Sequence, residues 1–272
     1  MTRPRSLLGY SAYVFDLDGT LYLGPFLIEG VGPLLDRLRG LGKTIRFLSN
    51  KPLQTRHDYA KKLRSLGVEA RDEEVMNSSA VAAQYLLREH PDARLYVVGE
   101  GPLIGELVDA GFKIVDNGEE CDLLLLSFDR DFHYLKLYNS MLAARRGVPV
   151  VATNPDVVCP VENGFIPDCG AVIAAVEACS DRKIDVVVGK PSDIMLQVIL
   201  EDVGFPPEEV LLVGDRLETD MTMGKRAGMA TALVLTGVTA AEKAEAWPEK
   251  PTYILPSAAA ILWDDSSHGS GE

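Results

Sequence analysis

Short apolar runs alternate with longer amphipathic stretches along the whole of this 272-residue chain. Each run is rich in Val, Ile or Leu and is bounded by glycine or polar residues, as expected of buried strands. The predicted strands are residues 12–17, 44–49, 95–99, 123–128, 148–152, 185–188, 210–214, 231–235 and 252–255. The predicted helices are residues 31–41, 55–66, 80–88, 134–146, 194–203 and 221–227. This alternation predicts an α/β fold whose parallel sheets are covered by helices on both faces.

The polar residues that follow the apolar runs are the first candidates for chemistry, because open parallel sheets bind ligands beyond the carboxyl ends of their strands. Four strand ends carry residues that suit a reactive or charged ligand. They are Asp16 and Asp18, Ser49 and Asn50, Lys190, and Asp215 and Asp220.

Asp16 and Asp18 end the first apolar run and are followed by Gly19. Residues i and i+2 of an extended chain point to the same side, so the two carboxylates can face one site. Gly19 allows a tight turn and a close approach of backbone N–H groups to an anion. Two carboxylates held close together need a cation or a shared proton. An Asp-Gly pair after a strand is also a common turn, and this structural interpretation stays open for the isolated motif.

The other three strand ends are ambiguous when each is taken alone. Ser49 and Asn50 can donate hydrogen bonds to a phosphate oxygen, but Ser-Asn after a strand also starts loops and caps helices. Lys190 either supplies a compact positive charge to a site or is a solvated surface lysine. Asp215 with Asp220 suits a hard cation such as Mg²⁺, whereas Asp220 alone can cap the helix that follows it.

Together and in this order, the four elements resemble the motifs of the haloacid dehalogenase (HAD) superfamily. The matching residues are Asp16, Asp18 and Thr20 in Asp-x-Asp-x-Thr, then Ser49, then Lys190, and a Gly-Asp-x-x-x-x-Asp segment that ends at Asp220. The long interval between the second and third motifs is similar to that of subfamily IIA, the p-nitrophenyl phosphatase and phosphoglycolate phosphatase type. The segments 153–156 and 188–192 are similar to that subfamily as well. The resemblance implies a Rossmann-like parallel-sheet core with an inserted α/β cap domain.

The resemblance also implies a role for each motif residue in a phosphoric monoester hydrolase. Asp16 is the implied nucleophile, which forms an aspartyl-phosphate, and Asp18 is the implied general acid and base. The resemblance places Mg²⁺ between the carboxylates of Asp16 and Asp215 and the backbone carbonyl of Asp18, with Asp220 in support. The residues expected to hold the phosphate are Ser49, Asn50 and Lys190.

By the same resemblance, residues 1–79 and 182–272 form a discontinuous core and residues 80–181 form the cap. The predicted cap holds 7 Lys and Arg residues against 16 Asp and Glu residues, so it carries most of the net charge of −13. Asn154 and Asp156 in the cap are weak candidates for contacts with the leaving group, since Asn-Pro-Asp is also a common turn. Lys51 and Asp168 stand where relatives usually have other residues, so we expect them to affect the choice of substrate.

Charge and composition exclude several classes of protein. With 40 acidic and 27 basic residues, the chain suits neither nucleic acid nor an anionic membrane surface, because both are bound through Lys and Arg. No apolar run approaches the ~20 residues of a transmembrane helix. The four cysteines form no C-x-x-C pair, so we expect a cytoplasmic protein without structural zinc. The expected partner is a small monophosphorylated metabolite, and a homodimer is compatible with the sequence.

Three alternative functions stay open at this point. Gly99, Gly101 and Gly105 follow an apolar run and open a helical stretch, which is similar to the turn of an NAD(P)-binding oxidoreductase. Their spacing is one residue longer than G-x-G-x-x-G, and Pro102 lacks an N–H that could face a phosphate. The second alternative is a phosphomutase or phosphotransferase that uses a sugar or alcohol acceptor. The third is a regulatory module that binds Mg²⁺ without turnover.

Overall fold

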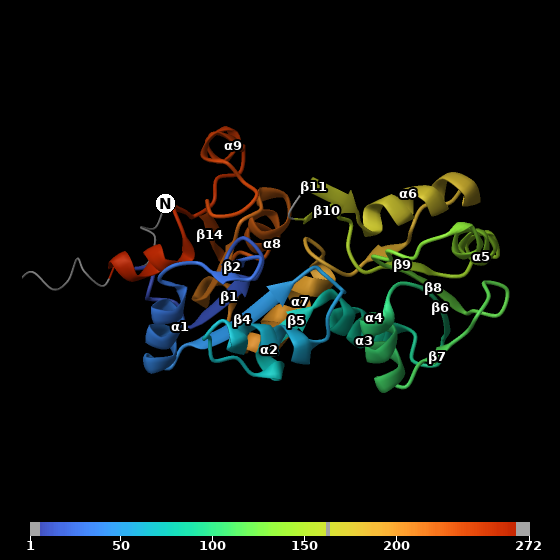
Figure 1. The fold of residues 1–272 in the computed structure, drawn as a ribbon, viewed down its shortest axis with the longest axis horizontal. Coiled ribbons are helices and arrows are strands. Elements are labelled where there is room, and N and C mark those ends of the chain that lie inside the picture. Colours follow the sequence, from blue (N-terminus) through green and yellow to red (C-terminus); the bar gives the residue numbers. More distant parts are fainter. Residues whose placement is uncertain (1–5, 162–163, 265–272) are drawn as a thin grey trace, which may run out of the picture. The chain divides into compact units, whose positions relative to one another are not determined.

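The computed structural model of the chain describes residues 6–161 and 164–264, which divide into two units with one parallel sheet each (Figure 1). The first unit is formed by Met1–Ser49, Tyr59–Met76 and Leu196–Glu272. The second unit is formed by Asn50–Asp58 and Asn77–Met195. The predicted core and cap boundaries, at residues 79/80 and 181/182, stay a prediction, and residues 1–5, 162–163 and 265–272 lie outside the described residues.

The sheet of the first unit has the strand order β15-β14-β13-β1-β4-β5. Its central strand β1 pairs in parallel with β13 on one side and with β4 on the other. Every residue of β1 is buried, as expected of a strand whose two faces are both covered. The strands are β1 (Ala12–Asp16), β4 (Thr44–Ser49), β5 (Val75–Asn77), β13 (Val210–Gly214), β14 (Ala230–Val234) and β15 (Tyr253–Leu255). The carboxyl ends of β1, β4 and β13 therefore lie at one edge of this sheet.

Amphipathic helices pack on the sheet of the first unit and complete its apolar core. In α1 the buried residues Val31, Leu34, Leu35 and Leu38 follow the helical period and join the core formed around β1 and β4. The helices are α1 (Val31–Gly40), α2 (Arg56–Ser65), α7 (Asp193–Val203), α8 (Thr222–Arg226) and α9 (Ala241–Ala246), of which α2 and α7 run across the boundaries between the units. Shorter elements are the hairpin β2 (Tyr22–Leu23) and β3 (Phe26–Leu27), the 3₁₀ turns Asp72–Glu74, Pro207–Glu209 and Ala258–Asp264, and a π-helical turn at Leu217–Met221.

The second unit has its own parallel sheet, with the strand order β12-β9-β8-β6-β7. Four consecutive leucines form β8, and all four are buried at the centre of this sheet. The strands are β6 (Arg94–Val98), β7 (Lys113–Ile114), β8 (Leu123–Leu126), β9 (Val150–Ala152) and β12 (Val186–Val187), with an antiparallel hairpin of β10 (Val158–Val161) and β11 (Gly164–Pro167). The helices are α3 (Ser78–Glu89), α4 (Gly101–Asp109), α5 (Tyr134–Arg145) and α6 (Cys169–Ser180).

The prediction of an α/β fold with two parallel sheets is confirmed, and each predicted strand and helix overlaps an element of the structure. The pattern did not reveal α6, because its residues are mostly small or apolar and show no alternation with polar ones. It also did not reveal the two-residue strands β2 and β3, which are too short for a period to be read. Among the described residues, no helix has the length and apolar character needed to cross a membrane. All four cysteines are free thiols.

Candidate functional site

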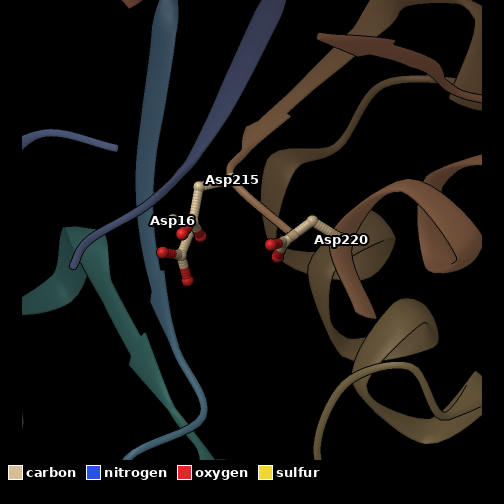
Figure 2. A group of neighbouring side chains, drawn as sticks. All are labelled: Asp16, Asp215 and Asp220. Carbon is tan, nitrogen blue, oxygen red and sulfur yellow. The ribbon is translucent and has the colours of Figure 1, made fainter. Parts of the chain in front are cut away.

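Three carboxylates meet at the strand ends of the first unit (Figure 2). Asp16 is the last residue of β1, Asp215 directly follows β13, and Asp220 lies in the π-helical turn after it. One oxygen from each residue lies within 4.8 Å of the other two. The two strands bring Asp16 and Asp215 together because β1 and β13 pair in register, with Phe15 opposite Val213.

Two glycines leave the space that Asp215 occupies. A Cβ on Gly237 would lie 1.9 Å from Asp215 Oδ2, and a Cβ on Gly19 would lie 2.6 Å from the same atom. The backbone N–H of Val238 donates to Asp215 Oδ2 at 2.7 Å. The hydroxyl of Thr236 donates to the carbonyl of Gly19 at 2.6 Å, which ties this loop to the turn after Asp16. The loop after β14 therefore holds Asp215 in place, and any side chain at position 237 would displace it.

A third glycine and a backbone N–H fix Asp220, which is fully buried. A Cβ on Gly214 would lie 2.4 Å from the carboxylate carbon of Asp220. The N–H of Arg216 donates to Asp220 Oδ2 at 3.3 Å. Asp220 is thus packed against the end of β13 rather than exposed at a helix start, which does not favour a simple capping role.

The turn after Asp16 places Tyr22 beside Asp18. The backbone of Asp18 forms a bridge with that of Tyr22, and the N–H of Gly19 donates to the carbonyl of Tyr22 at 2.9 Å. Burial raises the pKa of the Tyr22 hydroxyl far above its usual value, and the negative charge of Asp18 raises it further. The ammonium of Lys62 lies 3.7 Å from the centre of the Tyr22 ring, at cation–π distance. The phenol therefore stays neutral next to Asp18.

The donor set formed by Asp16, Asp215 and Asp220 fits a hard divalent cation. Three buried carboxylates this close repel one another unless a cation or protons neutralise them. Mg²⁺ prefers oxygen ligands and usually keeps several waters. The buried hydroxyls of Thr20 and Thr219, which are next to or near these residues in the chain, make no hydrogen bond to another described residue. These observations support a metal site at the end of β1.

A second cluster of predicted residues lies within the second unit. The side chain of Asn50 accepts a hydrogen bond from the N–H of Lys190 at 2.8 Å and donates to the carbonyl of Lys190 at 3.2 Å. It also donates to Asp156 Oδ2 at 3.1 Å. The side chain of Asn154 donates to the backbone carbonyl of Asn50 at 3.3 Å. Lys190 is buried, with 3% of its surface exposed.

The structure thus gathers the predicted residues into two groups, one in each unit. The first group is Asp16, Asp215 and Asp220. Asp18 and Ser49 belong to the same unit, and Ser49 Oγ lies 3.5 Å from the hydroxyl of Tyr59. The second group is Asn50, Asn154, Asp156 and Lys190. Sequence reasoning included Gly214 only as the glycine of the Gly-Asp-x-x-x-x-Asp motif, without its contact with Asp220, and it missed Gly237 and Val238. The signal for the last two was present, because Thr236-Gly237-Val238-Thr239 also follows an apolar strand.

Asp168, one of the two departures from the family pattern, is a buried helix cap. Its Oδ1 accepts a hydrogen bond from the N–H of Cys169 at 2.6 Å, at the start of α6. Burial raises the pKa of Asp168 to about 6, and the nearby charge of Asp156 adds to the effect, while Lys51 opposes it. Burial also raises the pKa of Cys169 to about 12, so this thiol stays protonated and is a poor nucleophile.

We expect Asp168→Asn to remove part of the pH dependence of stability. Because the folded-state pKa is raised from 3.8 to about 6, the stabilisation from the neutral carboxyl is present below pH ~4 and is lost as the pH rises through 6. The loss amounts to at most about 3 kcal/mol of unfolding free energy. Asparagine keeps the cap of α6 and does not titrate.

Urea unfolding of the wild type and Asp168→Asn between pH 4 and pH 7 measures this difference. Asp109→Asn, at an exposed position of α4, is the matched control. Stability curves of wild type and Asp168→Asn that stay parallel over this range would contradict the expectation.

The glycine-rich turn before α4 does not favour a dinucleotide. Glu100 is the N-cap of α4, and its carboxylate accepts hydrogen bonds from the N–H and the guanidinium of Arg130 at 2.6–3.0 Å. The Glu100 side chain makes no capping hydrogen bond to α4 and pairs with Arg130 instead, and its negative charge next to the helix start disfavours a pyrophosphate there. Pro102 lies in the first turn of the helix, as the sequence indicates.

Comparison with known proteins agrees with the motifs. Residues 13–113 match the family described as haloacid dehalogenase-like hydrolase, and residues 187–261 match one described as HAD-hydrolase-like. The acid sugar phosphatase of Staphylococcus epidermidis is 34% identical over 244 residues, which are 90% of this chain and 93% of that protein. The sugar-phosphatase AraL of Bacillus subtilis is 36% identical over 244 residues, which are 90% of this chain and 89% of that protein.

A solved structure extends the similarity to the fold. The 4-nitrophenylphosphatase of Thermotoga maritima superposes with a TM-score of 0.90 at 34% identity, over 95% of this chain and 98% of that chain. The similarity spans both units and both parallel sheets. From its motifs, its fold and these relatives, the chain belongs to the haloacid dehalogenase superfamily of hydrolases, in subfamily IIA of the p-nitrophenyl phosphatase type.

Proposed function

We propose that this protein is a Mg²⁺-dependent phosphatase that hydrolyses small phosphate monoesters through an aspartyl-phosphate on Asp16. The observation that carries the proposal is the buried cluster of Asp16, Asp215 and Asp220, whose oxygens lie within 4.8 Å of one another. A cluster of this kind gives a nucleophile and a cation site in one place. Both are needed because a phosphate dianion repels an unassisted carboxylate.

In the first step, a carboxylate oxygen of Asp16 attacks phosphorus and the bond from phosphorus to the ester oxygen breaks. The leaving oxygen takes a proton from the carboxyl group of Asp18, so the alcohol departs neutral. The products of this step are the alcohol and an acyl-phosphate on Asp16. Covalent catalysis divides one difficult displacement into two easier ones.

In the second step, a water molecule attacks the phosphorus of the acyl-phosphate. Asp18, now a carboxylate, accepts a proton from this water, and the bond from phosphorus to Asp16 breaks. Inorganic phosphate leaves and Asp16 and Asp18 return to their initial states. A proton acceptor at position 18 therefore favours turnover over a long-lived phosphoenzyme.

The residues that would hold Mg²⁺ are Asp16 and Asp215, with Asp220 beside them and the carbonyl of Asp18 as a further ligand. When bound, the cation neutralises the charge between the carboxylates and the phosphate and so lowers the barrier to attack. We also propose that Ser49 donates a hydrogen bond to the phosphate and that Lys190 contributes a positive charge to it. The motif resemblance supports these last two assignments.

The relatives point to the substrate class. Two of them are called sugar phosphatases and one is called a 4-nitrophenylphosphatase. The chain itself carries a net charge of −13, which disfavours the approach of polyanions. We therefore propose a small substrate with one phosphate group, of the sugar phosphate type. Phosphoglycolate and p-nitrophenyl phosphate are further candidates to be tested.

The test is an assay for inorganic phosphate over a panel of sugar phosphates, phosphoglycolate and p-nitrophenyl phosphate. We expect release in the presence of Mg²⁺ and none in EDTA, with activity restored when Mg²⁺ is added back. Release that continues unchanged in EDTA would contradict the proposal. Added sugar or alcohol acceptors separate the remaining alternative: transfer to the acceptor without release of phosphate would identify a phosphotransferase or mutase.

A further inference from the structure

The side chain of Asn50 uses its whole donor capacity within the protein. A carboxamide has two N–H donors and one carbonyl oxygen. One donor faces Asp156 Oδ2 at 3.1 Å and the other faces the carbonyl oxygen of Lys190 at 3.2 Å. The carbonyl oxygen accepts from the N–H of Lys190 at 2.8 Å. No donor is left for a phosphate oxygen, although the sequence predicts Asn50 as a phosphate ligand.

The backbone around this contact is built to let Asn50 come close. A Cβ on Gly189 would lie 2.8 Å from Asn50 Oδ1 and 2.3 Å from the carbonyl oxygen of Thr153, so only glycine fits at position 189. The carbonyl of Asn50 itself accepts hydrogen bonds from Ser78 Oγ at 2.7 Å and from Asn154 Nδ2 at 3.3 Å. Residue 50 is thus fixed through its backbone, while its side chain holds residue 190.

Asp156 determines which way the amide of Asn50 faces. A carboxylate only accepts hydrogen bonds, so it pairs with the nitrogen of the amide and directs the oxygen to the N–H of Lys190. Asp156 is itself positioned, because its N–H donates to Asn154 Oδ1 at 3.0 Å. With Asp156 in place, the amide meets both backbone groups of Lys190 with the correct polarity.

We propose that Asn50 and Asp156 are positioning residues for Lys190: the amide of Asn50, oriented by Asp156, clamps both backbone polar groups of Lys190 and so sets the origin of its side chain. The inference rests on the proposed function, in which the ammonium of Lys190 acts on the phosphoryl group. A lysine side chain has four rotatable bonds, so with its backbone fixed only these bonds remain to be ordered when the ammonium is held in one place.

A double-mutant cycle tests whether Asn50 acts through Lys190. We expect Asn50→Ala to lower kcat/KM about 10–100-fold, since three hydrogen bonds are lost, with most of the loss in kcat. In the Lys190→Met background, Asn50→Ala should cost no more than about threefold, because the group that it positions is gone. Losses that multiply in the double variant would overturn the proposal, because they would show that Asn50 acts independently of Lys190.

Variants at position 156 separate orientation from charge. Asp156→Ala removes the acceptor and should lose more activity than Asp156→Asn, whose carbonyl oxygen can still accept from Asn50. The swap Asn50→Asp with Asp156→Asn restores one hydrogen bond between the two positions and should recover activity relative to Asn50→Asp alone, in which two carboxylates face each other. Equal activity of Asn50→Asp and the swap would overturn the proposal, even where Asn50→Ala fails to fold.

Controls keep this inference apart from the proposed function. Gln84→Ala, at an exposed position of α3, is the matched control for folding and expression. If Lys190→Met and Asp16→Asn both leave phosphate release unchanged, the proposed function fails. If Lys190→Met lowers activity, and Asn50→Ala lowers the activity of Lys190→Met by the same factor as that of the wild type, the proposed function stands and the positioning role fails.

Discussion

We expect Asp16→Asn to abolish phosphate release while making the metal-free protein more stable. The variant removes the attacking oxygen, and loss of a covalent nucleophile lowers kcat by about 10⁴–10⁶-fold. It also removes one of three buried carboxylates whose oxygens lie within 4.8 Å of one another. In EDTA these charges repel, so the unfolding midpoint of Asp16→Asn should lie above that of the wild type.

Two measurements test this prediction: phosphate release in Mg²⁺ and thermal unfolding in EDTA. Asp36→Asn, an exposed aspartate on α1, is the matched control and should behave like the wild type in both. A variant with activity within tenfold of the wild type would remove Asp16 from its assigned role. A lower unfolding midpoint in EDTA would contradict the repulsion between the three carboxylates.

The second large effect is expected from a residue that carries no functional group. Gly237→Ala places a Cβ 1.9 Å from Asp215 Oδ2 if nothing moves, so the carboxylate must shift by more than an ångström. Asp215 then loses its hydrogen bond from the N–H of Val238 and its place beside Asp16. We expect Mg²⁺ affinity to fall at least about tenfold, as for loss of groups that orient a metal ligand.

Isothermal titration measures the Mg²⁺ affinity of Gly237→Ala. Unfolding in EDTA measures the stability of the metal-free variant separately. Gly40→Ala is the matched control, because a Cβ at that position meets nothing within 4 Å. Recovery of Gly237→Ala activity at high Mg²⁺ is the expected signature of a displaced ligand. Unchanged Mg²⁺ affinity in Gly237→Ala would show that Asp215 does not hold the cation.

The sequence predicts the chemistry of the first unit because each functional residue follows an apolar run. Asp16 ends β1 and Asp215 directly follows β13, and the rule that parallel sheets bind ligands at the carboxyl ends of their strands brings both to one edge. The rule does not say which strands are neighbours. β1 and β13 are almost two hundred residues apart in the chain, and only their pairing in the sheet makes Asp16 and Asp215 a site.

The sequence is less informative where packing decides the role of a residue. Gly237 looks like any turn glycine until the position of Asp215 is known. Asn50 has the chemistry of a phosphate ligand, but the structure engages both of its N–H groups with Asp156 and Lys190. Such roles depend on which atoms come within contact distance in the folded chain, which local sequence patterns do not encode.

The formation of an acyl-phosphate on Asp16 is the central claim, and trapping it is the most direct test. Asp18→Asn removes the group that activates water, and p-nitrophenyl phosphate has a leaving group that needs no proton from residue 18, so with this substrate the variant should accumulate the phosphoenzyme. Acid quenching with a substrate labelled in its phosphate should leave label on the peptide that contains Asp16, and hydroxylamine should release it. Turnover of labelled substrate by the wild type with inversion at phosphorus, and no label on Asp16 in Asp18→Asn, would contradict the account.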